Sequence, residues 1–138
     1  MPPDHHAGLL EFGRTTIDCG PQAPGEARAL LACWLDEHGH AALRADACLL
    51  VSELVTNSTV HAGQPAGAPL HLRATAIDGV VRIEVGDHGR GPVRPRAPDE
   101  STGGFGLRIV DLLAARWGVT HQHGTQVWFE LAAHHAET

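Results

Sequence analysis

Two polar side chains interrupt an apolar run that is typical of a buried helix, LLVSELVTNSTVHAG at residues 49–63. Glu53 and Asn57 stand four positions apart, and positions i and i+4 share one face of an α-helix. Burying a carboxylate and a carboxamide costs free energy unless a polar partner meets them. Their oxygens are hard ligands that suit Mg²⁺, and a carboxylate can also act as a base. Alternatively, the pair could lie on the solvated edge of an amphipathic helix.

Two glycine-containing segments further along the chain could hold a nucleotide. Asp87 ends an alternating apolar run and is followed by Gly89 and Gly91. Its carboxylate could accept a hydrogen bond from an adenine amino group, while the missing side chains let a flat ring approach the main chain. The second segment, GGFG at 103–106, leads into a helical pattern, and a helix N-terminus offers unpaired N–H groups to phosphates. Each segment alone could be an ordinary turn or the start of any helix.

The spacing of apolar residues predicts the elements that must position these groups. It indicates an edge strand at 9–17, a helix within 21–39, a second helix at roughly 43–62, and a β-hairpin at 69–87 that turns at Asp78-Gly79. It then indicates a loop at 88–104, a third helix at 104–118, and a final hairpin formed by residues 118–121 and 125–131. We therefore expect an α/β (α+β) two-layer sandwich, with helices packed on one face of a mostly antiparallel mixed sheet.

Composition limits the classes of function. A chain of 138 residues is long enough for one domain with a hydrophobic core and too short for two. The net charge of -6 does not attract nucleic acid through bulk electrostatics. The start of the chain lacks the pattern of a secretory signal, and no apolar run is long enough to span a membrane, so we expect a cytoplasmic protein without nucleic acid or membrane partners.

Cysteines and histidines give no clear metal site. The three cysteines are widely spaced and support neither a zinc knuckle nor a disulfide framework. The histidine pairs could form a metal site, but they lack the convergent spacing that such a site needs, and we interpret them as solvated. These pairs are His5-His6, His121 with His123, and His134-His135.

In their order and spacing, the three polar segments resemble the motifs of the Bergerat-fold (GHKL) ATPase and kinase superfamily, which includes histidine-kinase catalytic domains. The matching segments are ELVTN at 53–57 for the N-box, DHGRG at 87–91 for the G1 box and GFGLRIV at 104–110 for the G2 box. The ending GTQVWFEL at 124–131 resembles the terminal hairpin of small stand-alone actinobacterial members, which are similar to anti-sigma factor serine kinases. The resemblance covers residues from about 9 to 131.

The resemblance implies a role for each matching residue. Glu53 would be the general base, and Asn57 would ligate Mg²⁺. Asp87 would bind the adenine amino group, and Thr125 would lie near the adenine. The other cofactor-binding residues would shape the adenine pocket or cradle the phosphates of ATP: Gly89, Gly91, Gly104, Gly106 and Leu107. Residues 92–103 would form an ATP lid within a single kinase-like domain at 9–131, between a disordered N-terminus at 1–8 and a C-terminal tail at 132–138.

The function implied is that of a Mg²⁺- and ATP-dependent serine/threonine-protein kinase that phosphorylates an anti-sigma antagonist and sequesters a sigma factor. A homodimer is also suggested. The chain has no lysine, and Gln126 stands where relatives often carry one, which puts phosphotransfer in doubt more than nucleotide binding. An arginine could substitute, and those nearest in sequence to the motifs are Arg90, Arg94, Arg96 and Arg108.

Other functions remain open on the sequence alone. The main alternative is a catalytically silent module that senses ATP or ADP and so controls a partner protein. The catalytic half of a split histidine kinase would need a helix pair with a phosphoacceptor histidine, and the segment before Pro21 is too short for one. A nucleotide-free metalloprotein is the fourth possibility, and it would require that ATP fails to bind.

Overall fold

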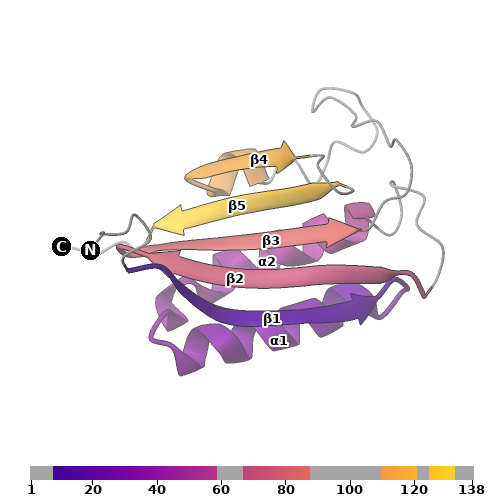
Figure 1. The fold of residues 1–138 in the computed structure, drawn as a ribbon, viewed down its shortest axis with the longest axis horizontal. Coiled ribbons are helices and arrows are strands. Elements are labelled where there is room, and N and C mark those ends of the chain that lie inside the picture. The colour runs from indigo at the N-terminus through magenta and orange to yellow at the C-terminus, as the bar shows by residue number, and fades with distance from the viewer. Residues whose placement is uncertain (1–7, 59–66, 88–109, 121–124, 133–138) are drawn as a thin grey trace, which may run out of the picture.

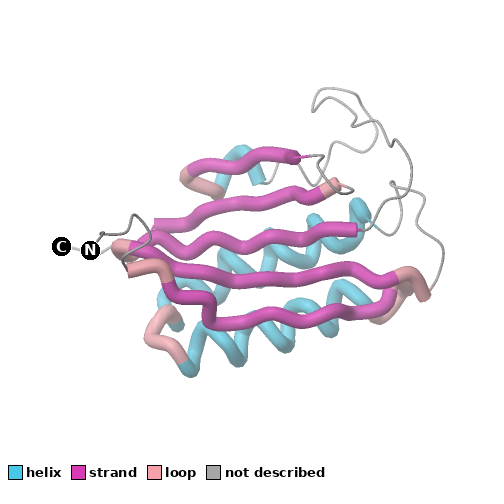
Figure 2. The backbone as a smooth tube through the Cα atoms, viewed as in Figure 1, coloured by secondary structure: helices cyan, strands magenta, loops and turns pink. Residues whose placement is uncertain are grey.

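Helices cover one face of a five-stranded sheet in the computed structural model of the chain, which describes residues 8–58, 67–87, 110–120 and 125–132 (Figure 1). The strand order is β1-β2-β3-β5-β4, and all four pairings are antiparallel. Figure 2 shows the helices together on one side of the strands, which confirms the expected two-layer sandwich. The strands are β1 Leu10–Asp18, β2 Pro69–Ile77, β3 Val80–Asp87, β4 Arg116–Thr120 and β5 Gln126–Ala132.

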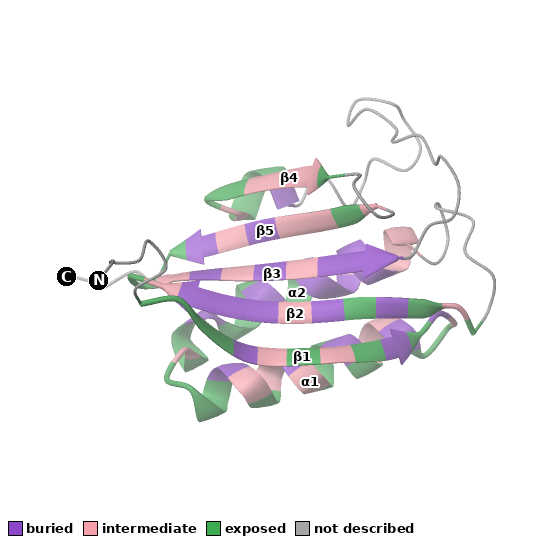
Figure 3. Cartoon of the chain, viewed as in Figure 1, coloured by how far each residue is buried: buried purple, intermediate pink, exposed green. Residues whose placement is uncertain are grey.

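The β2–β3 hairpin is the element that places Asp87 at the end of a central strand. Its two-residue turn has positive φ at both positions, 53° at Asp78 and 81° at Gly79, as a tight hairpin turn requires. Buried and less buried residues then alternate along β3 (Figure 3). The hairpin and its turn are therefore confirmed as the sequence predicted them.

Two long helices form the second layer. Helix α1, Ala23–Glu37, begins with a proline in its first turn and is followed by Gly39 at φ 83°. A short 3₁₀ helix, Ala41–Leu43, leads into α2, Arg44–Thr56. The Trp34 ring lies so close to Gly13 of β1 that a Cβ there would be 2.2 Å from it, so only glycine fits this contact. None of the helices in the described ranges is long and apolar enough to cross a membrane.

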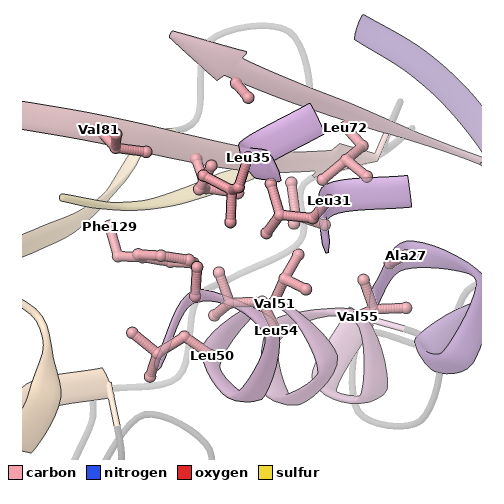
Figure 4. Close-up of a cluster of buried hydrophobic side chains, with 14 of the residues drawn as sticks. Ala27, Leu31, Leu35, Leu50, Val51, Leu54, Val55, Leu72, Val81 and Phe129 are labelled. Carbon is pink, nitrogen blue, oxygen red and sulfur yellow. The ribbon is translucent and has the colours of Figure 1, made fainter. Parts of the chain in front are cut away.

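The hydrophobic core lies between the sheet and these two helices. Leu31 and Leu35 of α1 and Val51 and Val55 of α2 are fully buried. Figure 4 shows Leu50 and Val51 of α2 near Phe129 of β5, which is also fully buried. Burying a side chain of this size contributes about 1.5–3 kcal/mol relative to leaving it exposed. The core therefore fixes α2 against the middle of the sheet.

The third helix ends earlier than the sequence predicted. Residues 110–113 are helical, but the chain enters β4 at Arg116 instead of continuing as a helix to 118. The Ala114 N–H donates to the Val110 carbonyl at 2.8 Å, and the Ala115 N–H donates to the Glu130 carbonyl of β5 at 2.8 Å. Pairing with β5 thus overrides the helix propensity of this alanine-rich segment. The predicted helix before residue 110 lies outside the described residues.

Candidate functional site

Asp87 lies at the end of β3 on the side that faces the helices. Val81, Ile83 and Val85 of the same strand point into the core, and side chains two residues apart share one face of a strand. Asp87 is only 4% exposed. A carboxylate so far from water is costly unless donors surround it, so this position is a strong candidate for ligand binding.

Thr125 holds Asp87 in place at the start of β5. The Asp87 N–H donates to the Thr125 carbonyl at 2.9 Å, and the Thr125 N–H donates to Asp87 Oδ1 at 3.3 Å. Within the described part of the chain, the second carboxylate oxygen of Asp87 has no hydrogen-bond partner. An adenine amino group supplies the kind of donor that such a buried oxygen lacks. The residues present therefore fit adenine.

Cys19, which the sequence did not single out, lies near the same carboxylate. It follows β1 and is buried, at the end of the sheet where β3 ends. Burial raises the pKa of its thiol, and the negative charge of Asp87 raises it further. The Cys19 N–H donates to the Ala68 carbonyl at 2.8 Å, which ties the β1–α1 connection to the segment before β2. No motif marks this residue, because only strand pairing brings it beside Asp87.

Glu53 and Asn57 lie at the C-terminal end of α2. Both are partly buried, four residues apart on the helix. Helix α2 packs on β3, and Figure 1 shows its C-terminal end behind the arrowhead of β3, where Asp87 stands. The structure therefore brings the Glu53/Asn57 pair and the Asp87/Thr125 pair to one end of the two layers.

The oxygens at the end of α2 fit a Mg²⁺ ion that is held mainly by phosphates. Within the described residues, no group of three or more histidine, cysteine, aspartate or glutamate side chains could hold a metal. Mg²⁺ commonly takes only one or two protein ligands and completes its shell with phosphate oxygens and water. Asn57 could supply such a ligand beside ATP, with the Glu53 carboxylate one turn away.

The remaining predicted site residues lie outside the described residues. The five positions expected to line the adenine pocket or cradle phosphates are Gly89, Gly91, Gly104, Gly106 and Leu107. The expected lid at 92–103 lies outside as well, and so do the four arginines nearest the motifs, Arg90, Arg94, Arg96 and Arg108. Their roles stay predictions.

Gln126 points away from Asp87. It pairs with Gly86, and a Cβ on Gly86 would be 2.8 Å from Gln126 Cγ. The Gln126 side chain therefore lies across Gly86 on the open face of the sheet, which is the face that α1 and α2 do not cover (Figure 2). Asp87 faces the opposite side. A lysine at position 126 would therefore extend from the wrong face of the sheet to meet a nucleotide held by Asp87. This bears on position 126 alone, because the chain has no lysine at any other position either.

The open face of the sheet carries a network of charges that the sequence did not reveal. Glu11 accepts hydrogen bonds from Arg14 at 2.7 Å and Arg73 at 2.8 Å, and these bonds, that from Arg14 foremost, lower the pKa of Glu11 to about 2. Further along, the Arg82 guanidinium lies 3.9 Å from the centre of the Trp128 ring, a cation–π distance. Strand register brings Arg73 to Glu11 and Trp128 to Arg82, whereas Glu11 and Arg14 are three positions apart on β1.

The arrangement of layers and strands defines the fold class as that of the GHKL-type ATPases. Residues 20–131 match the family model of the histidine kinase-like ATPase domain, and the chain belongs to this family. This confirms the superfamily that the three sequence motifs indicated. In general terms, the chain is an ATP-binding domain of the kinase-like ATPase type.

A solved structure shows the same fold. The chain is similar to the crystal structure of the RsbU and RsbW domains of Rv1364c from Mycobacterium tuberculosis, with a TM-score of 0.65 and 24% sequence identity. The match covers 87% of this chain, and the chain spans 32% of the length of that one. At this identity the likeness establishes the fold alone. A comparison with curated proteins gave no match.

Proposed function

We propose that this chain is an ATP-dependent serine/threonine-protein kinase that phosphorylates an anti-sigma antagonist and sequesters a sigma factor. The observation that carries the proposal is the buried Asp87 carboxylate. One of its oxygens has no hydrogen-bond partner among the described residues. The carboxylate lies at the same end of the two layers as Glu53 and Asn57 (Figure 1). Membership of the histidine kinase-like ATPase family and the sequence resemblance to anti-sigma factor serine kinases support the same proposal.

The proposed chemistry assigns one task to each group. Asp87 would accept a hydrogen bond from the adenine amino group, and Asn57 would ligate a Mg²⁺ ion, which would neutralise part of the charge on the phosphates. Glu53 accepts the proton of the acceptor hydroxyl. The hydroxyl oxygen then forms a bond to the γ-phosphorus while the bond to the β–γ bridging oxygen breaks, leaving ADP. Positioning and electrostatic stabilisation supply most of the catalysis in reactions of this kind.

The partners follow from the resemblance. The acceptor serine would belong to an anti-sigma antagonist, and its phosphorylation would change which partner this chain holds. Fold likeness to a chain that contains an RsbW domain supports this proposal at the level of architecture. A cytoplasmic location, a homodimer, and a single domain at 9–131 with a lid at 92–103 are parts of the same proposal.

The test replaces Glu53 with glutamine and measures ATP binding and phosphotransfer separately. A pull-down with and without ATP first identifies the antagonist. Glu53→Gln should then bind Mg²⁺-ATP as the wild type does but transfer little or no phosphate to that antagonist, because the proton acceptor is lost. Glu26→Gln, an exposed change in the first turn of α1, is the matched control and should leave both properties unchanged. Phosphotransfer by Glu53→Gln near the wild-type rate would show that Glu53 is not the base.

A catalytically silent nucleotide-sensing module is the second candidate, and one observation favours it. The chain has no lysine. Five of the six arginines in the described ranges are already held in ion pairs: Arg14, Arg44, Arg73, Arg82 and Arg116. A cation for the γ-phosphate would therefore have to come from Arg28 or from the arginines outside the described residues, which are Arg90, Arg94, Arg96 and Arg108. ATP-dependent capture of a partner by the wild type, with no phosphate transferred to it, would favour this candidate over the kinase.

A further inference from the structure

Seven charged side chains form one continuous arginine–glutamate network across the open face of the sheet, and all five strands contribute to it. Figure 2 looks onto this face, with the helices behind the strands. The ion-pair distances along the network run from 2.7 to 3.5 Å. From one edge strand to the other, its members are Arg14, Glu11, Arg73, Glu84, Arg82, Glu130 and Arg116. Each glutamate therefore lies between two arginines, and an arginine stands at each end.

The arginines at the ends of this network are far more exposed to solvent than the glutamates in its middle. The side chains of Arg14 and Arg116 are 65% and 67% exposed, whereas those of Glu84 and Glu130 are 19% and 15% exposed. A guanidinium carries five N–H donors. Within the described residues, the hydrogen bonds of each network arginine use no more than two of these donors. The network therefore presents unused N–H donors to solvent, while Asp18 of β1 adds one carboxylate to the same face outside the network.

An indole ring supports one half of the network. The Arg82 guanidinium lies 3.9 Å from the centre of the Trp128 ring, and that of Arg116 lies 5.8 Å from it. Both distances allow a cation–π attraction. The ring and the ion pairs hold these guanidinium groups in place before any ligand arrives. A ligand that binds them would therefore cost less side-chain entropy than one that must order free arginines.

We propose that the open face binds an acidic segment of a partner protein, whose carboxylates pair with the arginines of the network. The whole chain has a net charge of -6, yet four of the six arginines in the described ranges stand on this one face. An acidic segment would meet the exposed guanidinium groups before the less exposed glutamates. Two copies of this chain meeting by the same face would bring arginine against arginine, so a second copy is less complementary. The inference goes beyond the proposed function and does not depend on it, because Asp87 faces the other side of the sheet.

Titration of the full chain with a fluorescent decaglutamate peptide tests the proposal. The wild type should bind this peptide at low salt in spite of its own negative charge, and the affinity should fall as the ionic strength rises. Arg14→Ala and Arg116→Ala should each weaken binding by about fivefold, the upper range for an exposed ion pair. Because the two residues lie on opposite edge strands, the double variant should lose about 25-fold. ATP affinity should stay at the wild-type value, and the melting temperature of each variant shows that it is folded.

Arg44→Ala is the matched control. The Arg44 side chain is 49% exposed and pairs with Asp36 at 2.7 Å, but it belongs to α2 in the helical layer. Its removal changes the net charge of the chain by the same amount as the removal of Arg116. The variant should bind the peptide as the wild type does. If Arg44→Ala weakens binding as much as Arg116→Ala, the peptide responds to any exposed arginine and the proposal is wrong.

The other possible occupants of the open face give different results. A wild type that fails to bind the peptide at low salt would overturn the proposal. So would a thymidine oligonucleotide of the same length that binds more tightly than the peptide and is weakened by the same two substitutions, since the face would then take nucleic acid. Sedimentation equilibrium checks for a second copy. A dimer that the double variant dissociates would show that this face joins two copies of the chain, and the proposal would fail.

Discussion

Replacing Asp87 with asparagine tests the adenine site with little change in shape. The amide oxygen of the new side chain can still accept the Thr125 N–H, which donates to Asp87 Oδ1 at 3.3 Å in the wild type. The other oxygen becomes an NH₂ group. That NH₂ group would face the amino group of adenine, and both groups are hydrogen-bond donors. In the wild type, the adenine amino group would instead meet a charged carboxylate oxygen, which accepts.

The expected loss follows from burial and charge. A hydrogen bond to a charged group contributes about 1.5–3 kcal/mol, and each 1.4 kcal/mol is tenfold in affinity, so ATP binding should weaken by roughly 10- to 150-fold. Asp87 is only 4% exposed, so water cannot easily replace the lost partner, and the upper part of this range is expected. The new NH₂ can donate to the carbonyl oxygen of guanine, so the preference for ATP over GTP should also narrow.

Titration calorimetry with ATP and GTP measures both effects. Glu84→Gln is the matched control, because Glu84 belongs to the same strand but lies on the open face, where it pairs with Arg82 at 3.0 Å. That variant should bind ATP as the wild type does. An Asp87→Asn protein with unchanged melting temperature and unchanged ATP affinity would refute the placement of adenine at this carboxylate.

Three further predictions concern stability. Because the hydrogen bond from Arg14 is the main cause that lowers the pKa of Glu11 from 4.5 to about 2, Glu11 stabilises the fold above pH 4.5 and loses this contribution as the pH falls toward 2. In Glu11→Gln, the melting temperature should therefore fall less between pH 4.5 and pH 2 than in the wild type, and high salt should reduce this difference. An equal fall in the two proteins would contradict the prediction. Burial lowers the pKa of His40 below 6.5, so its contribution is present above pH 6.5 and is lost as the pH falls through the lower folded value. His40→Gln should reduce that loss in melts between about pH 7 and pH 5, and an unaltered loss would count against it. Gly118→Ala would place a Cβ 2.7 Å from Trp128 Cζ2, and urea unfolding should show destabilisation by about 1–3 kcal/mol, which a simultaneous Trp128→Leu change should largely relieve.

Features that depend on neighbouring residues were predictable from the sequence. The alternation from residue 69 to 87, with Asp78-Gly79 between two apolar runs, specifies a hairpin because each signal is local. That hairpin leaves Asp87 at a strand end. The i, i+4 spacing of Glu53 and Asn57 needs only the helix period. The structure brings Asp87 and the Glu53/Asn57 pair to one end of the layers (Figure 1), while the glycine-containing segments at 89–91 and 103–106 lie outside the described residues.

Features that depend on strand register were not predictable. The segment around Ala114 reads as helix, but pairing with β5 begins at Ala115, and the energy of that pairing is invisible in the local sequence. The face on which Gln126 lies is set by its pairing with Gly86, 40 positions earlier in the chain by their numbers. The charge network around Glu11 and Arg73 likewise joins residues from different strands.

Successive side chains of β5 point to opposite faces of the sheet, so the strand carries one set of side chains on each face. Val127, Phe129 and Leu131 contribute to the core side, while Gln126, Trp128 and Glu130 belong to the open face. Inserting or deleting one residue within this strand would exchange the two sets, sending an indole and a carboxylate inward and three apolar side chains into water. Point substitutions here should thus be tolerated far better than changes of length.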